Sequence, residues 1–211
     1  MTKVGVLGSG TVGETLANGF LKHGYGVMRG SREPNKLAAW RSKSSASTGT
    51  FAETAAFGEI VVLAVKGDAA LDVIRACGTA LDGKVVLDTT NPITADGPDE
   101  GMLTMFTGPN DSLIERLQRA NTKARFVKCF SCVGGANMVN PPFPERPTMF
   151  ICGNDKDAKA DTTRLLDIFG WDTEDLGGVK GGRAIEPLCI AWCAPGFLEN
   201  RWTHAFRVMK R

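Results

Sequence analysis

Three glycines at G-x-G-x-x-G spacing stand near the start of the sequence, in the run Gly8-Ser9-Gly10-Thr11-Val12-Gly13. The run follows a short apolar segment, residues 3–7, and leads into residues 11–23, where apolar side chains recur at helical spacing. Between a strand and a helix, such glycines allow a tight turn, a close backbone approach to a diphosphate and close helix packing. Unpaired N–H groups at the start of the helix also attract phosphate charge. The motif therefore predicts a dinucleotide-binding turn.

Polar residues after the second expected strand indicate which dinucleotide this turn would bind. NAD sites carry, about 20 residues after the glycines, an acidic residue that binds the ribose 2′-hydroxyl. This sequence instead has Ser31 and Arg32, which can hydrogen-bond a 2′-phosphate and stack on adenine, and Lys36 adds a second cation. Glu33 opposes this interpretation but suits the start of the next helix, and the cations could also be plain surface residues. We predict NADP(H).

The end of the apolar run at residues 60–65 is expected to face the nicotinamide half of the dinucleotide. Small side chains at Ala64, Val65 and Ala69 would let the nicotinamide ribose lie against the backbone. Lys66 could either neighbour the diphosphate or remain a solvated loop lysine.

Two later segments complete the expected site. Asn91 could bind the carboxamide or the ribose, although an Asn-Pro pair also simply makes a turn. Gly135 and Ala136 offer a surface almost free of side chains, as a flat ring stacked on nicotinamide would require.

Strand-like and helical segments alternate along most of the chain. We expect strands at 3–7, 25–28, near 50, 60–65, 85–87 and 124–127. Helices are expected at 11–23, 35–41, from an Asp68 cap to about 78, and at 111–120. This order predicts an α/β protein with a doubly wound parallel sheet, the Rossmann arrangement.

The remainder is expected to continue this pattern more loosely. A strand at 148–152, a helix at 155–169 and a short strand from Trp171 precede a helical segment, 183–211, interrupted at Pro195-Gly196. We predict a dinucleotide-binding domain at 1–152 and a small C-terminal helical extension at 153–211. The irregular stretches 91–110 and 137–147 are expected to border the cleft.

Composition narrows the class of protein. The 211 residues carry a net charge of +2, so nucleic acid is not an expected partner. The longest apolar run is too short to cross a bilayer and no signal peptide is evident, which predicts a cytoplasmic protein without a membrane segment. The 6 cysteines are expected to be reduced, buried thiols, and no metal site is expected despite a C-x-x-C at Cys129 and Cys132.

Several motifs together resemble the NADP oxidoreductases that depend on coenzyme F420, a deazaflavin. They are the glycine run at 8–13, Gly30-Ser31-Arg32, Asp88-Thr89-Thr90-Asn91-Pro92 and Lys128-Cys129-Phe130-Ser131. Segments 183–188 and 202–206 resemble the same group, so the likeness covers essentially the whole chain. It extends to the cytosolic reductase domain of six-transmembrane metalloreductases.

The resemblance implies a set of cofactor contacts. NADP is implied at residues 9–12, Ser31, Arg32, Lys36, Val65 and Ala69, and the second ring system near Gly135 and Ala136. The sequence departs from the family at Lys66, where relatives often carry proline, and at residues 129–132. The cofactor half of the resemblance is therefore closer than the acceptor half.

We expect an NADP-dependent oxidoreductase that transfers a hydride between NADPH and a ring cofactor, coenzyme F420 or a flavin (FMN or FAD). Such transfer needs two rings stacked roughly 3–3.5 Å apart, and the cofactors carry the chemistry. We therefore name no catalytic residue. One alternative is a reductase of a small imine or carbonyl compound, although only about 60 residues remain for the helical domain that such enzymes add. The other is a non-enzymatic NADPH-binding sensor.

Three remaining features have structural interpretations. Asp88 is expected to cap its own loop, and His204 to lie at the surface or in a dimer contact. The apolar segment that includes Trp192 and Trp202 is expected to form a homodimer interface, a lid or simply core packing.

Overall fold

A computed structural model describes residues 1–210 of the chain. Six parallel strands form one sheet, in the order β3-β2-β1-β4-β5-β6. The strands are β1 (Lys3–Leu7), β2 (Gly26–Gly30), β3 (Ser47–Gly49), β4 (Ile60–Leu63), β5 (Val85–Asp88) and β6 (Arg125–Lys128). The chain moves outward from β1 to β3, then returns to the other side of β1 for β4. This order confirms the predicted doubly wound α/β fold and places its switch point between β1 and β4.

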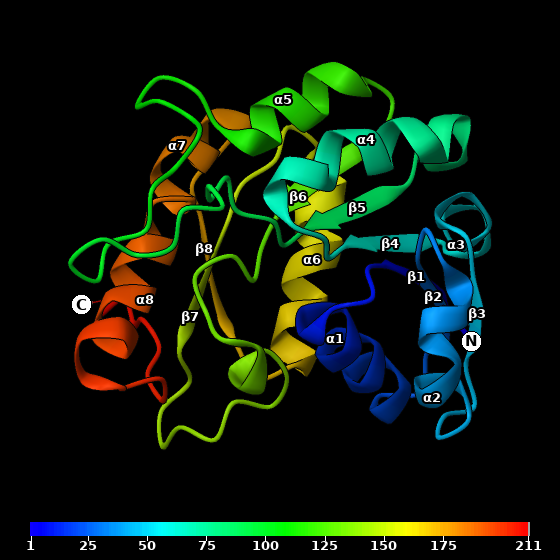
Figure 1. Ribbon diagram of the computed structural model, residues 1–211, viewed down its shortest axis with the longest axis horizontal. Coiled ribbons are helices and arrows are strands. Elements are labelled where there is room, and N and C mark those ends of the chain that lie inside the picture. Colours follow the sequence, from blue (N-terminus) through cyan, green and yellow to red (C-terminus); the bar gives the residue numbers. More distant parts are fainter. Residues whose placement is uncertain (211) are drawn as a thin grey trace.

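Helices cover both faces of this sheet (Figure 1). One face carries α1 (Thr11–Lys22), α2 (Ala38–Arg41) and α6 (Lys156–Ile168), and the other carries α3 (Phe51–Phe57), α4 (Gly67–Cys77), α5 (Leu113–Ala120) and α7 (Gly182–Ile185). Short 3₁₀ turns occur at η1 (Pro34–Leu37), η2 (Gly78–Leu81), η3 (Gly135–Asn137) and η4 (Val179–Gly181).

Alternation along the strands produces two separate hydrophobic cores. In β4, Val62 packs with α1 and α6, whereas Val61 and Leu63 pack with α3, α4 and α5. Successive side chains of a strand point to opposite faces, so a strand that is apolar throughout must be covered on both sides. The continuous apolar run of β4 thus accounts for its central place.

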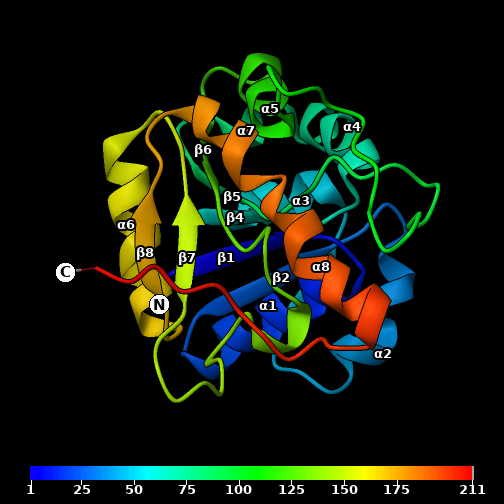
Figure 2. The same ribbon diagram turned by 90° about the vertical axis from the view of Figure 1, so that its left-hand side faces the viewer.

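A second, two-stranded parallel sheet lies beside the first and pairs β7 (Thr148–Ile151) with β8 (Asp172–Asp175). A single antiparallel bridge, Lys128 to Cys152, links it to β6. The last helix, α8 (Leu188–Glu199), runs across the end of the large sheet toward which the arrows of β4 and β5 point (Figures 1 and 2). The expected strands at 148–152 and 171 onward exist, but they do not extend the main sheet.

The structure adds one helix to those expected and corrects two expectations. Helix α3 was not predicted, because its 7 residues are few and apolar on more than one face. Asp68 does not cap α4: the N-cap is Lys66, and Asp68 lies in the first turn, where a carboxylate is favourable beside the helix dipole. Pro195 does not interrupt the last helix, which ends at Asn200 in the left-handed conformation.

The segment after α8 is not helical, contrary to the expectation for 183–211. Residues 201–210 run extended beside β7, where the N–H of Thr148 donates to the carbonyl of Phe206 over 2.8 Å. Within residues 1–210, no helix combines the length and the apolar character needed to cross a bilayer.

Candidate functional site

Two adjoining cavities lie at the carboxyl ends of the central strands. Their volumes are about 820 Å³ and about 420 Å³. Both are lined by Gly10 of the glycine turn and by Ala64, Val65, Lys66 and Asp68 after β4. The cavities therefore form one cleft that crosses the switch point of the sheet, where open α/β sheets bind ligands.

The structure brings most of the predicted site residues into this cleft. The larger cavity is also lined by Ser9, Ser31, Arg32, Lys36 and Ala69, and the smaller one by Thr11, Val12 and Asn91. Gly8 and Gly13 are buried beneath the turn. Gly135 and Ala136 line neither cavity; a Cβ on Gly135 would lie 3.7 Å from the Thr15 hydroxyl, so this segment borders α1 instead.

The glycines of the turn have different steric surroundings. A Cβ on Gly8, whose φ is +154°, would lie 2.1 Å from the carbonyl oxygen of Ala64, and one on Gly13 would lie 2.7 Å from the carbonyl oxygen of Gly8. Gly10 has ordinary extended dihedrals, and a Cβ there would meet nothing within 4 Å. Packing thus explains Gly8 and Gly13, whereas Gly10 keeps open the space above the turn.

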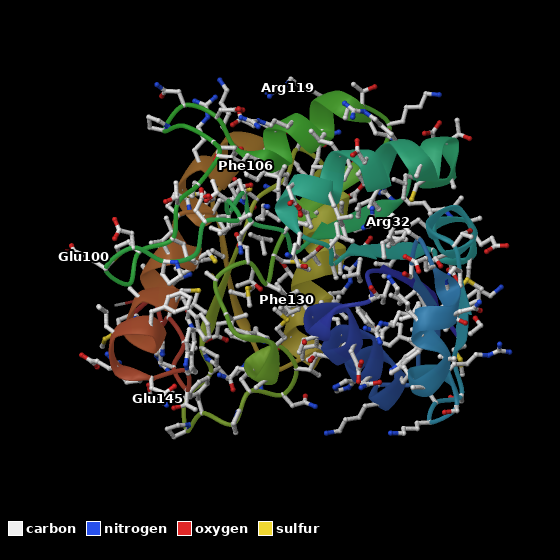
Figure 3. All side chains as sticks on the ribbon, in the orientation of Figure 1. Arg32, Glu100, Phe106, Arg119, Phe130 and Glu145 are labelled. Carbon is white, nitrogen blue, oxygen red and sulfur yellow. The ribbon has the colours of Figure 1, made fainter. Side chains whose placement is uncertain are left out.

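Cationic side chains cluster at the end of β2. Arg32 is exposed and lies, in the view of Figure 3, just below α4, whose Asp68 and Asp72 line the same cavity. The Lys36 ammonium is 2.8 Å from a carboxylate oxygen of Glu33, and both side chains are exposed. The hydrogen bond from Lys36 lowers the pKa of Glu33, so this carboxylate is ionised at neutral pH. The hydroxyl oxygen of Ser31 accepts the N–H of Glu33.

The cleft includes residues that the sequence had not singled out. Phe51, Asp72, Val73 and Ala76 line the larger cavity, and Thr89, Thr90, Ile93, Thr94 and Ala95 line the smaller. Phe51 opens helix α3, which begins with a full capping box between Thr50 and Glu53. That T-x-x-E spacing is the sequence signal that would have located the helix and its cleft residue.

Asn91 has hydrogen-bonding capacity left over. Its side-chain amide donates to the carbonyl of Ser131 over 2.7 Å. Its Oδ1 is buried and receives no hydrogen bond from residues 1–210. Buried polar atoms are nearly always paired, so this oxygen is suited to accept an N–H from a ligand in the smaller cavity.

A buried charge cluster lies behind the Thr89–Asn91 segment. The Lys128 ammonium is 2.8 Å from the carbonyl of Thr90 and 2.9 Å from Glu186 Oε1. Glu186 also accepts the first N–H groups of α5, at Leu113 and Ile114. Asp88 caps its own loop as expected, because its Oδ1 accepts both the N–H and the hydroxyl of Thr90.

The cysteines are free thiols, and four of the six are buried. Burial raises the pKa of Cys132 to about 12 and that of Cys129 well above its ordinary value. Both are therefore protonated at neutral pH and poor nucleophiles. Among residues 1–210, no group of three or more histidine, cysteine or acidic side chains is arranged to hold a metal ion.

His204 is packed inside the C-terminal segment. Its ring stacks on Trp192 with centroids 5.1 Å apart, and its Nε2 donates to the Trp192 carbonyl over 3.0 Å. Trp192 in turn donates its ring N–H to the carbonyl of His204. His204 is half-buried, and these contacts give it a role in fixing residues 201–210; its expected place at the surface or in a dimer contact stays a prediction.

The family model for the coenzyme F420-dependent NADP oxidoreductases matches residues 3–92. A crystal structure of a proposed F420-dependent NADP reductase from Arthrobacter sp. FB24 shares 30% identity and a TM-score of 0.92, with 100% of both chains covered.

Two curated relatives match at lower identity. The F420-dependent NADP reductase of Methanocaldococcus jannaschii is 26% identical over 132 residues, which cover 62% of this chain and 59% of the relative. Metalloreductase STEAP3 of Rattus norvegicus is 24% identical over 210 residues, which cover 93% of this chain and 39% of the relative. The chain thus spans less than two thirds of the length of either relative.

Proposed function

The chain belongs to the family of coenzyme F420-dependent NADP oxidoreductases, and from this membership we propose that it transfers a hydride between NADP(H) and a ring cofactor, either coenzyme F420 or a flavin. The observation that carries the proposal is the continuity of the two cavities over the glycine turn. One extended ligand can lie across that turn with a different half in each cavity.

The residues of the cleft fit NADP(H). Nothing within 4 Å of the Gly10 Cβ position obstructs a diphosphate above the turn. The larger cavity has Ser31, Arg32 and Lys36 at one corner, which suits a 2′-phosphate, and Phe51 and Val73 on its walls, which suit adenine. The smaller cavity has the unpaired Oδ1 of Asn91, which suits the carboxamide N–H of nicotinamide.

When bound, the dinucleotide supplies the hydride, so the chain's own residues act by position and by exclusion of water. Thr89 donates its hydroxyl to the carbonyl of Leu63, and Thr90 is fixed by Asp88. These hydrogen bonds fix the position of the Thr89–Asn91 segment relative to the end of β4. The hydride transfer between two rings requires no acid or base from a side chain. The one proton that the reduced acceptor takes up in addition comes from solvent, and no residue is proposed to supply it.

The acceptor is proposed to lie on the side bordered by Gly135 and Ala136. Next to them, the Trp192 ring packs so closely on Gly134 that a Cβ there would be 2.4 Å from the ring. This contact fixes the main chain at Gly134, next to the two small residues proposed to border the acceptor.

The proposal is tested by offering coenzyme F420, FMN and FAD separately to the purified protein and following oxidation of NADPH. Turnover with one of them is expected. NADPH binding without any turnover would contradict the proposed reaction; it would then favour a sensor, or a reductase of a small imine or carbonyl compound, which a panel of such compounds would detect.

We also propose that the protein is a cytoplasmic homodimer. Phe197, Leu198 and Trp202 are 42%, 61% and 37% exposed, a cluster of large apolar side chains that contact with a second copy would cover. Analytical ultracentrifugation tests this: a monomer at micromolar concentration would contradict it.

A further inference from the structure

Arg29 is a charged residue in the interior of the main sheet. It belongs to β2, and its side chain is only 1% exposed. Burial of a guanidinium is costly unless its donors are satisfied. Its one carboxylate partner, Glu14, is 52% exposed, so ion pairing alone does not account for this residue.

Two of the bonds that Arg29 makes go to the glycine turn. Its Nε donates to the carbonyl of Gly8 over 3.0 Å, and its Nη2 donates to the carbonyl of Gly10 over 2.8 Å. Its Nη1 is 3.1 Å from Glu14, and its guanidinium carbon lies 5.2 Å from the ring centroid of Trp40. The Arg29 guanidinium thus packs against the Trp40 ring and donates hydrogen bonds to two carbonyls of the glycine turn.

These carbonyls determine where two N–H groups point. In a trans peptide the C=O and N–H bonds point in opposite directions. The carbonyl of Gly8 shares its peptide with the N–H of Ser9, and the carbonyl of Gly10 shares its peptide with the N–H of Thr11. Holding the Gly8 carbonyl toward Arg29 therefore turns the Ser9 N–H away from it. The Gly10 carbonyl also accepts the N–H of Glu14 over 3.0 Å, so Arg29 and the first turn of α1 together turn the Thr11 N–H away. Neither of these two N–H groups donates to a backbone or side-chain acceptor within residues 1–210, and Ser9 and Thr11 line the cleft.

We propose that Arg29 is a positioning residue for the dinucleotide diphosphate: it fixes the turn so that the N–H groups of Ser9 and Thr11 face the ligand before it arrives. This inference rests on the proposed binding of NADP(H). It assigns to the interior of β2 a function in cofactor affinity that is separate from the 2′-phosphate selection proposed for Arg32. Preorganised donors bind an anion better because no ordering is needed on binding.

The test compares two ligands in calorimetric titrations of the full chain. NADP⁺ contains the diphosphate and the 2′-phosphate, whereas adenosine 2′-monophosphate contains only the latter. Arg29→Met, which keeps the length and loses the donors, is expected to weaken NADP⁺ by roughly ten-fold or more while leaving adenosine 2′-monophosphate unchanged. Arg32→Ala should weaken both ligands, and Arg164→Met, an exposed change on α6, should weaken neither.

Two outcomes of these titrations would contradict the proposal. Unchanged NADP⁺ affinity in Arg29→Met would overturn it, and equal loss of both ligands would show a general structural role. If Arg29→Met does not fold, Arg29→Lys replaces it, because a lysine can reach one of the two carbonyls but not both. Arg29→Lys should show a smaller selective loss of NADP⁺ affinity. An unchanged NADP⁺ affinity in this variant would also overturn the proposal. A wild-type protein that binds neither ligand would instead remove the proposed function itself.

Discussion

The ammonium of Lys128 lies 2.7 Å from Oδ2 of Asp88, and neither side chain has exposed surface. Asp88 ends β5 and Lys128 ends β6, so the pair joins two neighbouring strands directly behind the smaller cavity. With Glu186 at 2.9 Å, the lysine also ties this point to the start of α5 and to the C-terminal segment. The stability of the strand ends behind the smaller cavity therefore depends on the buried positive charge of Lys128.

Removing that charge should destabilise the protein strongly. Lys128→Met would leave two carboxylates buried without their cation, and we expect a loss of about 3–5 kcal/mol in the free energy of unfolding. Lys123→Met, which removes an exposed lysine paired with Asp82, should cost at most about 1 kcal/mol. Urea denaturation of the three proteins provides the measurement, and similar losses for both variants would refute the importance assigned to the cluster.

The pair of Lys128 and Asp88 also predicts that the free energy of unfolding changes with pH in the alkaline range. Burial would lower the pKa of Lys128, but the charges of Asp88 and Glu186 outweigh it and raise the pKa above 10.5. Because the folded protein holds this proton more tightly than the unfolded chain, the contribution is complete below pH 10.5 and is lost as the pH rises toward the folded value. The stability gap between wild type and Lys128→Met should therefore be constant from neutral pH to about pH 9 and narrow above pH 10.5. A gap that already narrows near neutrality would contradict this.

Gly10→Ala should separate ligand binding from folding. Its Cβ meets nothing in the protein within 4 Å and its φ of −82° suits alanine, so stability should be unchanged or slightly raised. The methyl group would occupy the space proposed for the diphosphate, so NADPH affinity should fall. In contrast, Gly8→Ala should destabilise the fold, because its Cβ would lie 2.1 Å from the Ala64 carbonyl oxygen. Thermal unfolding and NADPH titration of both variants test this; a Gly10→Ala protein that binds NADPH normally would count against the site.

Arg32→Ala tests the choice of dinucleotide. Loss of a charge-assisted bond to the 2′-phosphate should weaken NADPH binding by about 1–3 kcal/mol, whereas NADH binding should barely change. Fluorescence titration with each nucleotide measures both. Equal weakening of the two would show that Arg32 does not contact the 2′-phosphate.

The Glu33→Gln substitution should strengthen NADPH binding, the opposite of the effect expected for Arg32→Ala. This carboxylate is ionised and bonded to Lys36 at the corner proposed for the 2′-phosphate. The substitution frees the Lys36 ammonium and removes a negative charge close to the proposed 2′-phosphate position. The affinity for NADPH should therefore rise, while the affinity for NADH should stay about the same. A weaker NADPH complex would place Glu33 among the groups that support the nucleotide.

The sheet was predictable from sequence because β1, β4 and the turn between β1 and α1 have local signatures. The apolar run at 60–65 and the glycine spacing require no knowledge of distant residues. Helix α3 was missed although its capping box is equally local. Residues 201–210 were wrongly predicted to be helical, because their conformation depends on the hydrogen bond with Thr148, far away in the chain.

Most residues that line the cleft could be predicted from sequence for a similar reason: the turn, the cation cluster and the strand ends each occupy a short segment. The role proposed for Arg29 could not be predicted from sequence, because it depends on hydrogen bonds to the carbonyls of Gly8 and Gly10, which only the structure shows. Gly135 and Ala136 were singled out by their lack of large side chains and by the resemblance, and the structure places them beside α1 rather than in either cavity.

A crystal structure with NADP⁺ bound is the most direct test of the claim that this cleft holds the dinucleotide. We expect the diphosphate oxygens to accept the N–H groups of residues 9–12 and the 2′-phosphate to contact Ser31 and Arg32. A nucleotide bound elsewhere, or one in the cleft with Ser31 and Arg32 turned away from its 2′-phosphate, would contradict it.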